Sequence, residues 1–264
     1  MAPGPRFRST RFNLKPAEPS VVTGRSARAS DRTLHVSRFT LPSIAMENTN
    51  NQVAISLRGM VYVHLIESPS PQDLLDGRTE GAVLRESLDL AAIPNSYNLA
   101  TDRATFETAI TDKIHSAMAA FDAHPLLHFS MHGSQDGLGL TSGDIITWSK
   151  LASHIRATAP LAGCGLIVCM SSCYGAFARR MAFTHESAPY FLLFGHPGDL
   201  DWVDAAVGFT ALYHRLFKGV PSLEAAVNAM REASGDNRFD LSYSPRDQAA
   251  WRQHTHDLAR SSEK

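Results

Sequence analysis

The stretch "LIVCMSSCYG", residues 166–175, is an apolar run that stops at two serines, a cysteine and a glycine. Continuous apolar runs of this kind are typical of strands buried on both faces, as in parallel sheets. After Gly175, Phe177 and Met181 follow at a helical spacing. We therefore predict a strand over residues 165–173 that ends at Cys173, and a helix that begins near Ala176.

Strand and helix patterns alternate along the rest of the chain. Strands are predicted over 59–66, 96–100, 125–133, 189–195 and, at a sheet edge, 238–243, with a hairpin over 138–147. Helices are predicted from Asp73, over 106–121, from Trp148, over 203–217 and over 223–230. This alternation predicts an α/β domain with a mostly parallel sheet of about six strands and helices on both faces.

Two strand ends carry residues capable of chemistry. In parallel sheets, ligands bind beyond the carboxyl ends of the strands, and here one strand ends at His132-Gly133 and another at Cys173. A thiolate is the nucleophilic form of cysteine, and both a helix N-terminus and a nearby imidazole favour it. The backbone N–H groups of Gly133 and Cys173 are candidates for an oxyanion hole.

An apolar strand that ends in "SMHG", followed 41 residues later by one that ends in "SSCYG", resembles the caspase-like cysteine peptidases, and most of all the bacterial CHAT (caspase–HetF-associated) type. The segments 137–155 and 192–234 resemble the hairpin, strand and helices of the same domains. The resemblance implies a three-layer sandwich in which His132 is the general base and acid and Cys173 the nucleophile. It further implies an endopeptidase that cleaves a specific protein partner, as in bacterial defence or regulated cell death.

The resemblance also assigns candidate substrate-binding residues. The family places a specificity-setting residue two positions before the cysteine, which here is Ser171, and this small side chain leaves the P1 preference unassigned. Asp199, Asp201 and Trp202 follow the next strand, where the family builds part of its substrate pocket. An acidic side chain that faced inward there would favour a basic P1 residue.

Other chemistries fit the sequence less well. Cys164 and Cys169 are expected to be small buried residues. The i, i+4 pairs His128/His132 and Cys169/Cys173 lie on predicted strands, where four residues span roughly 13 Å, so we expect no metal site and no cofactor. An α/β-hydrolase with a cysteine nucleophile would need its histidine after Cys173, and His185, His196 and His214 are available. The non-enzymatic alternative is a caspase-like scaffold that binds peptides without cleaving them.

Charge divides the chain into two regions. Residues 1–45 hold eight of the 25 Lys and Arg residues but two of the 26 acidic ones, so the remainder carries seven more acidic than basic residues. An acidic body argues against nucleic-acid binding by the main domain. We expect 1–45 to be a disordered extension with Met46 as an alternative start, although a transit peptide or a partner-binding arm also fits, and 46–264 to be the peptidase domain.

Cysteine content and hydropathy indicate the compartment. Three cysteines, clustered between Cys164 and Cys173, suit a reducing environment rather than a disulfide-stapled domain. No apolar run reaches the ~18 residues of a membrane span. The sequence therefore predicts a cytoplasmic protein without a membrane span. The family resemblance further implies protein or peptide substrates and a regulatory partner protein.

Overall fold

The computed structural model describes residues 47–49, 52–158, 166–183, 188–250 and 252–253. The basic segment 1–45, Met46, Cys164 and His185 lie outside these residues. The first described element is a two-stranded antiparallel ladder, β1 (Glu47–Thr49) with β2 (Gln52–Ala54).

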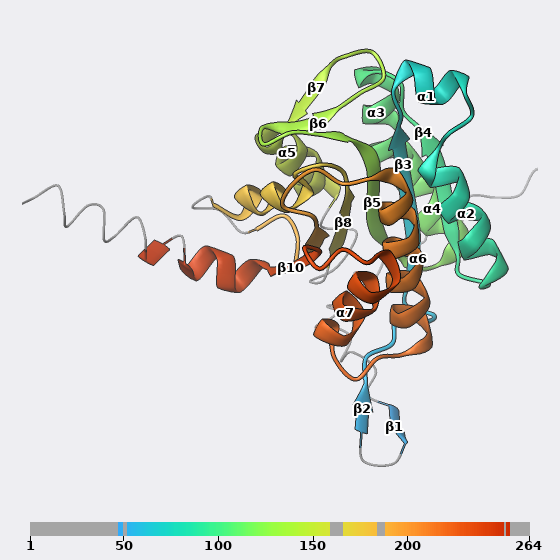
Figure 1. Ribbon diagram of the computed structural model, residues 1–264, viewed down its shortest axis with the longest axis vertical. Helices are drawn as coiled ribbons and strands as arrows, with labels where there is room; N and C mark the ends of the chain where they lie inside the picture. Colours follow the sequence, from blue (N-terminus) through green and yellow to red (C-terminus); the bar gives the residue numbers. More distant parts are fainter. Residues whose placement is uncertain (1–46, 50–51, 159–165, 184–187, 251, 254–264) are drawn as a thin grey trace, which may run out of the picture. The chain divides into compact units, whose positions relative to one another are not determined.

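The main sheet is mixed and mostly parallel (Figure 1). Its continuous row of strands is, in spatial order, β10 (Asp240–Tyr243), β9 (Leu192–Gly195), β8 (Ile167–Ser171), β5 (His124–Gly133), β3 (Val61–Ser68) and β4 (Asn95–Leu99). Each pair from β9 to β4 is parallel, and β10 pairs antiparallel with β9 at the edge. The predicted mostly parallel sheet and its edge strand are confirmed.

The predicted number of strands is wrong, because the sheet has eight rather than about six. The two additional strands are the hairpin β6 (Gly137–Gly139) and β7 (Ile145–Thr147). The sequence predicted this hairpin, but not that its first strand would pair antiparallel with the end of β5, where His132 lies opposite Gly139. A long β5 that continues past its partner β8 makes this pairing possible and brings the hairpin next to the candidate site.

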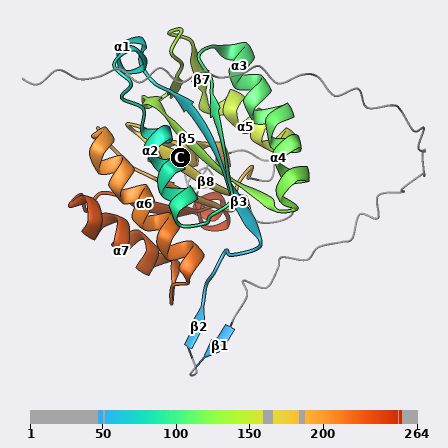
Figure 2. The ribbon, with the colours of Figure 1, turned by 90° about the vertical axis from the view of Figure 1, so that its right-hand side faces the viewer.

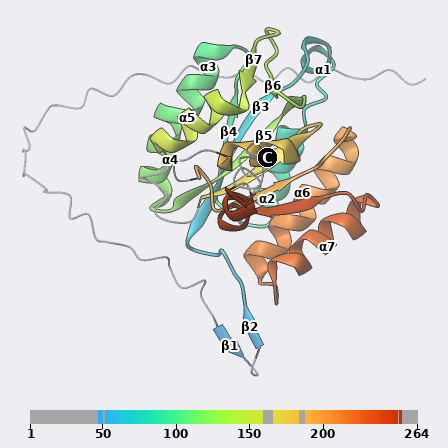
Figure 3. The same ribbon diagram turned by 90° about the vertical axis from the view of Figure 1, so that its left-hand side faces the viewer.

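Helices cover both faces of the sheet (Figures 2 and 3). One face packs against α2 (Glu80–Leu90), α6 (Trp202–Lys218) and α7 (Leu223–Ser234). The other packs against a long helix, built from α3 (Arg103–Thr108), the π-helical segment η1 (Ala109–Lys113) and α4 (Ile114–Phe121), and against α5 (Trp148–Thr158). A short helix, α1 (Pro71–Leu75), follows β3, and a 3₁₀ helix, η3 (Gly175–Ala182), follows the cysteine turn.

Strand alternation decides which side chains reach which face, because successive residues of a strand point to opposite sides. On β5, Leu127, Phe129 and Met131 join the core beneath α3, α4 and α5, whereas Leu126 joins the core beneath α2 and α6. The even-numbered residues of β5, up to His132, therefore point toward α2 and α6. On β8 the same face receives Ile167 and Cys169, and with them the odd-numbered positions.

No helix in the described part of the chain is both long enough and apolar enough to cross a membrane.

Phe209 anchors α6 to the sheet and provides a test of the core. Its fully buried ring meets the rings of His128 at a centroid distance of 4.9 Å and of Phe239 at 5.9 Å. Because a buried aromatic side chain leaves a cavity when truncated, Phe209→Ala should lower the free energy of unfolding by about 3–5 kcal/mol in urea denaturation. Leu75→Ala, at a side chain that is 80% exposed, should change it by less than about 0.5 kcal/mol; equal effects would contradict the assigned core.

Candidate active site

The register between β5 and β8 brings the two candidate catalytic residues to one place. His128 lies opposite Cys169 and Ser130 opposite Ser171, and two residues beyond that last pair come His132 and Cys173. Both side chains line the same small pocket of about 20 Å³, a volume that holds about one water molecule. The residues that the sequence singled out at two strand ends thus share one pocket.

The backbone beside His132 lies directly against the cysteine turn. A Cβ atom added to Gly133 would overlap the carbonyl oxygen of Cys173 and would come within 2.9 Å of the Ser172 Cβ. Real Cβ atoms do not approach other atoms so closely, so this contact requires glycine at position 133. Of the backbone hydrogen bonds among the described residues, none uses the Cys173 N–H.

Cys173 is half-buried and its sulfur interacts with the loop that follows β9. The Leu200 N–H donates to the Cys173 Sγ at 3.3 Å. The thiol in turn lies 3.7 Å from the Leu200 carbonyl oxygen, to which it can donate. The sequence predicted a helix N-terminus next to the sulfur, whereas the structure has a 3₁₀ helix that begins at Gly175 and a backbone donor from a different loop.

The cysteine turn is held by two hydrogen bonds to the same loop. Tyr174 has a left-handed backbone, with φ of 56°, and its N–H donates to the Gly198 carbonyl at 2.8 Å. The Ala176 N–H donates to the carbonyl of His196 at 3.0 Å. A non-glycine residue in this conformation is uncommon and is maintained by its surroundings, so the 196–200 loop fixes the direction in which Cys173 leaves the strand.

His132 lies at the rim of the pocket with about half of its side chain exposed. Its ring meets that of Trp202 edge-on, at a centroid distance of 5.6 Å and an angle of 79°. Its Nε2 atom lies 4.0 Å from the Asp73 Oδ2 atom on α1. The sequence gave no role to Asp73; the signal for it was a carboxylate just past the end of β3, at the same edge of the sheet.

The four candidate substrate-binding residues separate into two groups. Trp202 and Ser171 line the pocket with Cys173. Ser171 is buried, however, and its hydroxyl donates to the carboxyl oxygens of Glu80 at 2.7 and 2.8 Å. Asp201 caps helix α6, because its Oδ1 accepts from the Val203 N–H, and Asp199 is exposed and does not line the pocket.

Glu80 is the pocket residue that the sequence did not indicate. Its carboxyl group is buried and accepts hydrogen bonds from the hydroxyls of Ser130 and Ser171. Burial raises its pKa to about 8, and the nearby carboxylate of Glu67 contributes to the increase. The Nε2 atom of His128 lies 4.0 Å from the Oε1 atom of Glu80, and burial lowers the pKa of that imidazole to about 3. Between about pH 3 and pH 8 both side chains are therefore neutral, and they lie beneath the candidate catalytic residues.

The chain matches no known family model and no curated protein. The evidence for the site is therefore its own geometry.

Gly133 gives a direct test of the contact between the two strand ends. Gly133→Ala should force Cys173 and Ser172 to move, which should lower the melting temperature and slow the alkylation of Cys173 by a thiol reagent. Gly139→Ala is the matched control, since the nearest atom to a Cβ there is the Cβ of His132 at an ordinary 3.6 Å. Equal alkylation rates in the two variants would contradict the close approach.

The buried titratable groups predict a particular dependence of stability on pH. Glu80 keeps its proton up to about pH 8 in the folded state but loses it near pH 4.5, the ordinary value of a glutamate, when unfolded, so its contribution to stability falls as pH rises between these values. The pKa values of buried His128 and His64 are about 3 and 4 in the folded state and 6.5 in the unfolded state. Their contribution to stability is therefore lost as pH falls below 6.5, the opposite of the Glu80 effect. From pH 6.5 to 8 these two histidines no longer contribute, and the decline comes from Glu80 together with Glu67, whose pKa burial also raises.

In that interval the free energy of unfolding should therefore fall by up to about 1.4 kcal/mol per pH unit for each of the two carboxyl groups. Glu80→Gln should flatten the decline, as measured by urea denaturation in steps across the interval. Glu86→Gln, at an exposed position of the same helix, should leave the decline unchanged. A decline as steep in Glu80→Gln as in the wild type would show that Glu80 is not among the groups that titrate.

Proposed function

We propose that this protein is a cysteine endopeptidase that uses Cys173 and His132 to cleave peptide bonds in a specific protein partner. The observation that supports the proposal most is that a thiol and an imidazole, presented by neighbouring strands β5 and β8, line one pocket at the carboxyl edge of a mostly parallel sheet. This is the edge at which α/β folds carry their active sites. The helix layers on both faces of the sheet fit the caspase-like architecture that the sequence motifs resemble.

The proposed chemistry begins when the Cys173 thiol gives its proton to His132, which leaves the nucleophilic thiolate. The sulfur attacks the scissile carbonyl carbon and forms a C–S bond, while the negative charge moves to the carbonyl oxygen. The N–H groups of Cys173 and Gly133 are the proposed donors to that oxyanion. As the C–N bond breaks, protonated His132 gives its proton to the leaving nitrogen. His132 then takes a proton from a water molecule, which attacks the thioester and releases the carboxylic acid and the thiolate.

Two contacts support His132 as the base. The edge of Trp202 limits the rotation of the imidazole, and the Asp73 carboxylate lies 4.0 Å from its Nε2 atom. In a catalytic pair of this kind, a carboxylate beside the imidazole orients the ring toward the nucleophile. Asp73 is thus the proposed positioning residue of the pair. Its other contacts, a hydrogen bond from Ser70 and an ion pair with Arg78, hold the carboxylate in place.

The histidine that an α/β-hydrolase would use is less suitable. His196 follows β9, but its ring is fully buried, with Nε2 3.2 Å from the Asp236 carboxylate and Nδ1 3.0 Å from the Gly198 carbonyl. His196 does not line the pocket that contains Cys173. Its contacts instead suit a structural role, in which His196 supports the loop that carries Gly198. The cysteine-hydrolase alternative is therefore the second candidate, and the peptide-binding scaffold the third.

The biological setting follows from the resemblance alone. A cytoplasmic protease that acts on one partner protein in a bacterial defence or regulated-death system fits the CHAT-type motifs, and a regulatory partner would then set the time of cleavage. A basic P1 preference that depends on Asp199 or Asp201 is not part of the proposal, because Asp201 is committed to capping α6 and Asp199 lies off the pocket.

Cleavage of a P1-varied library of fluorogenic peptides tests the proposal. Cys173→Ala and His132→Ala should each lower kcat/KM by at least about 10³-fold, since the two residues act as a unit. Cys169→Ala is the control: that thiol is fully buried, burial raises its pKa to about 12, and its loss should leave cleavage unchanged.

Other outcomes identify the alternatives. Activity that survives in His132→Ala and disappears in His196→Ala would favour the hydrolase. A thiol-directed probe that never labels wild-type Cys173, together with no cleavage of any peptide, would favour the scaffold.

A further inference from the structure

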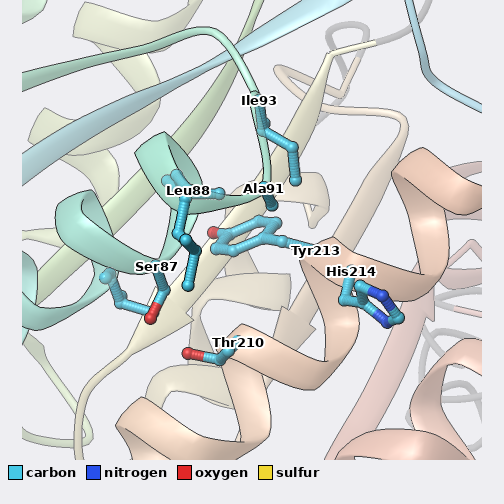
Figure 4. A pocket seen from close by; sticks show the side chains of 9 residues that line it. Ser87, Leu88, Ala91, Ile93, Thr210, Tyr213 and His214 are labelled. Atoms are coloured by element: carbon cyan, nitrogen blue, oxygen red, sulfur yellow. The ribbon is translucent and has the colours of Figure 1, made fainter.

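Helices α2 and α6 lie side by side on one face of the sheet and enclose a groove between them (Figures 2 and 4). The groove consists of two adjoining cavities of about 350 and 300 Å³, which share Ala91, Ile93 and His214. In Figure 4, Ser87 of α2 and Thr210 of α6 flank the first cavity. We call the two cavities together the α2–α6 groove.

On α2, a stripe of side chains includes Ser87 and Leu90, which line the first cavity. Val83, Ser87 and Leu90 recur at i, i+4 and i+7, a spacing that puts them on one side of a helix. Val83 is 54% exposed and Leu90 92%. The neighbouring stripe faces away from α6, because Arg85 lies over the ring of Tyr97 on β4 and Asp89 accepts a hydrogen bond from Asn95.

On α6, a matching stripe consists of Val203, Val207, Thr210 and His214, again at helical spacing. Val203 is 68% exposed and Val207 41%. Over the eleven residues from Val203 to His214 a helix rises about 16 Å, which is the length of about five residues of extended chain. Exposed apolar side chains in one line on two adjacent helices are typical of an interaction site.

Both helices that border the groove begin at the candidate active site: α2 starts at Glu80 and α6 at Trp202, two residues that line the pocket with Cys173. The groove itself begins further along the helices, at Leu84 of α2 and Thr210 of α6. A polypeptide that occupies the catalytic pocket is therefore positioned to continue along Val203 and Val207 into the groove.

The other end of the groove is basic. Arg58 and Lys218 line the second cavity together with His214. Neither Arg58 nor Lys218 forms a salt bridge within the part of the chain that the structure describes. From the candidate site toward these cationic side chains, α6 thus presents first the exposed Val203 and Val207 and then the groove.

We propose that the α2–α6 groove is an exosite that binds an extended, apolar segment of the substrate protein, with an acidic side chain at the end distant from the scissile bond. The proposal rests on the proposed peptidase function and explains how such an enzyme would select one protein. The apolar stripes bind the segment, and Arg58 and Lys218 fix its register and direction. An exosite of this kind acts on the affinity for long substrates and leaves the hydrolysis of short ones unchanged.

Four fluorescein-labelled peptides test the groove directly by fluorescence anisotropy. All four share a central apolar run of five residues. Two carry a pair of Glu and two a pair of Lys, and within each kind the pair stands at the N-terminus of one peptide and at the C-terminus of the other. Wild-type protein should bind a Glu peptide roughly tenfold more tightly than the matching Lys peptide. The double variant Arg58→Glu/Lys218→Glu should invert this preference, and Val207→Asp should weaken the binding of both kinds of peptide. The matched control is Lys113→Glu/Lys150→Glu, two exposed lysines on η1 and α5 in the opposite helix layer, which should keep the wild-type preference.

Equal affinity of the wild type for the two kinds of peptide, or a preference that survives the double reversal, would overturn the proposal. Hydrolysis of short P1-varied peptides and alkylation of Cys173 are measured in the same variants and should be unchanged, since Arg58 and Lys218 lie outside the catalytic pocket. If these variants hydrolyse short peptides normally but show no charge preference, the exosite fails and the peptidase stands. If the preference inverts while even the wild type hydrolyses nothing, the groove stands and the peptidase fails.

Discussion

The buried carboxyl group of Glu80 connects the elements that form the candidate site. It accepts hydrogen bonds from Ser130 of β5 and Ser171 of β8, which lie opposite each other in the sheet, and it stands at the first residue of α2. Leaving either hydroxyl without its partner in this buried position would cost about 1–3 kcal/mol. A neutral carboxyl group avoids the larger cost of a buried charge. One protonated side chain therefore adds a link between β5, β8 and α2 beneath His132 and Cys173, in addition to the backbone ladder that pairs the two strands.

Backbone contacts set the geometry above this network. Gly133 lies against the carbonyl of Cys173, and Leu200 directs its N–H at the sulfur. Because backbone groups on packed strands and loops have few alternative positions, they hold the thiol more firmly than flexible side chains would. The loop 196–200 is supported in turn by His196, which is buried between Asp236 and the ring of Phe239. The Cys173 sulfur is thus positioned by backbone groups of Gly133 and Leu200, and the strands that carry it and His132 are linked by the Glu80 carboxyl group.

Much of this arrangement could be predicted from the sequence, because apolar runs and helical spacing report burial locally. They predicted β5, β8, most of the helices and the end of β5 at His132 and Gly133. The predicted end of β8 at Cys173 was wrong by two residues, because β8 ends at Ser171 and Cys173 lies in the turn that follows. Glu80 could not be predicted, since an acidic residue in the first turn of a helix is normally exposed, and only the packing of α2 on the sheet buries it. The Leu200 N–H has no sequence signal at all. Asp201 did have one, an aspartate immediately before a helical run, and it indicated a cap rather than a substrate contact.

The pocket lined by His132 and Cys173 is small, and its size limits where a peptidase built on it could recognise its substrate. With room for about one water molecule and a floor occupied by Glu80 and Ser171, the pocket has no space for a large side chain in its present conformation. A substrate residue that entered deeper would have to displace the hydroxyl–carboxyl hydrogen bonds that join β5 to β8, at a cost of several kcal/mol. Binding energy for a selective peptidase must then come from surface outside the pocket. The exposed apolar side chains of α2 and α6, which begin at the pocket rim, are the surface that this constraint favours.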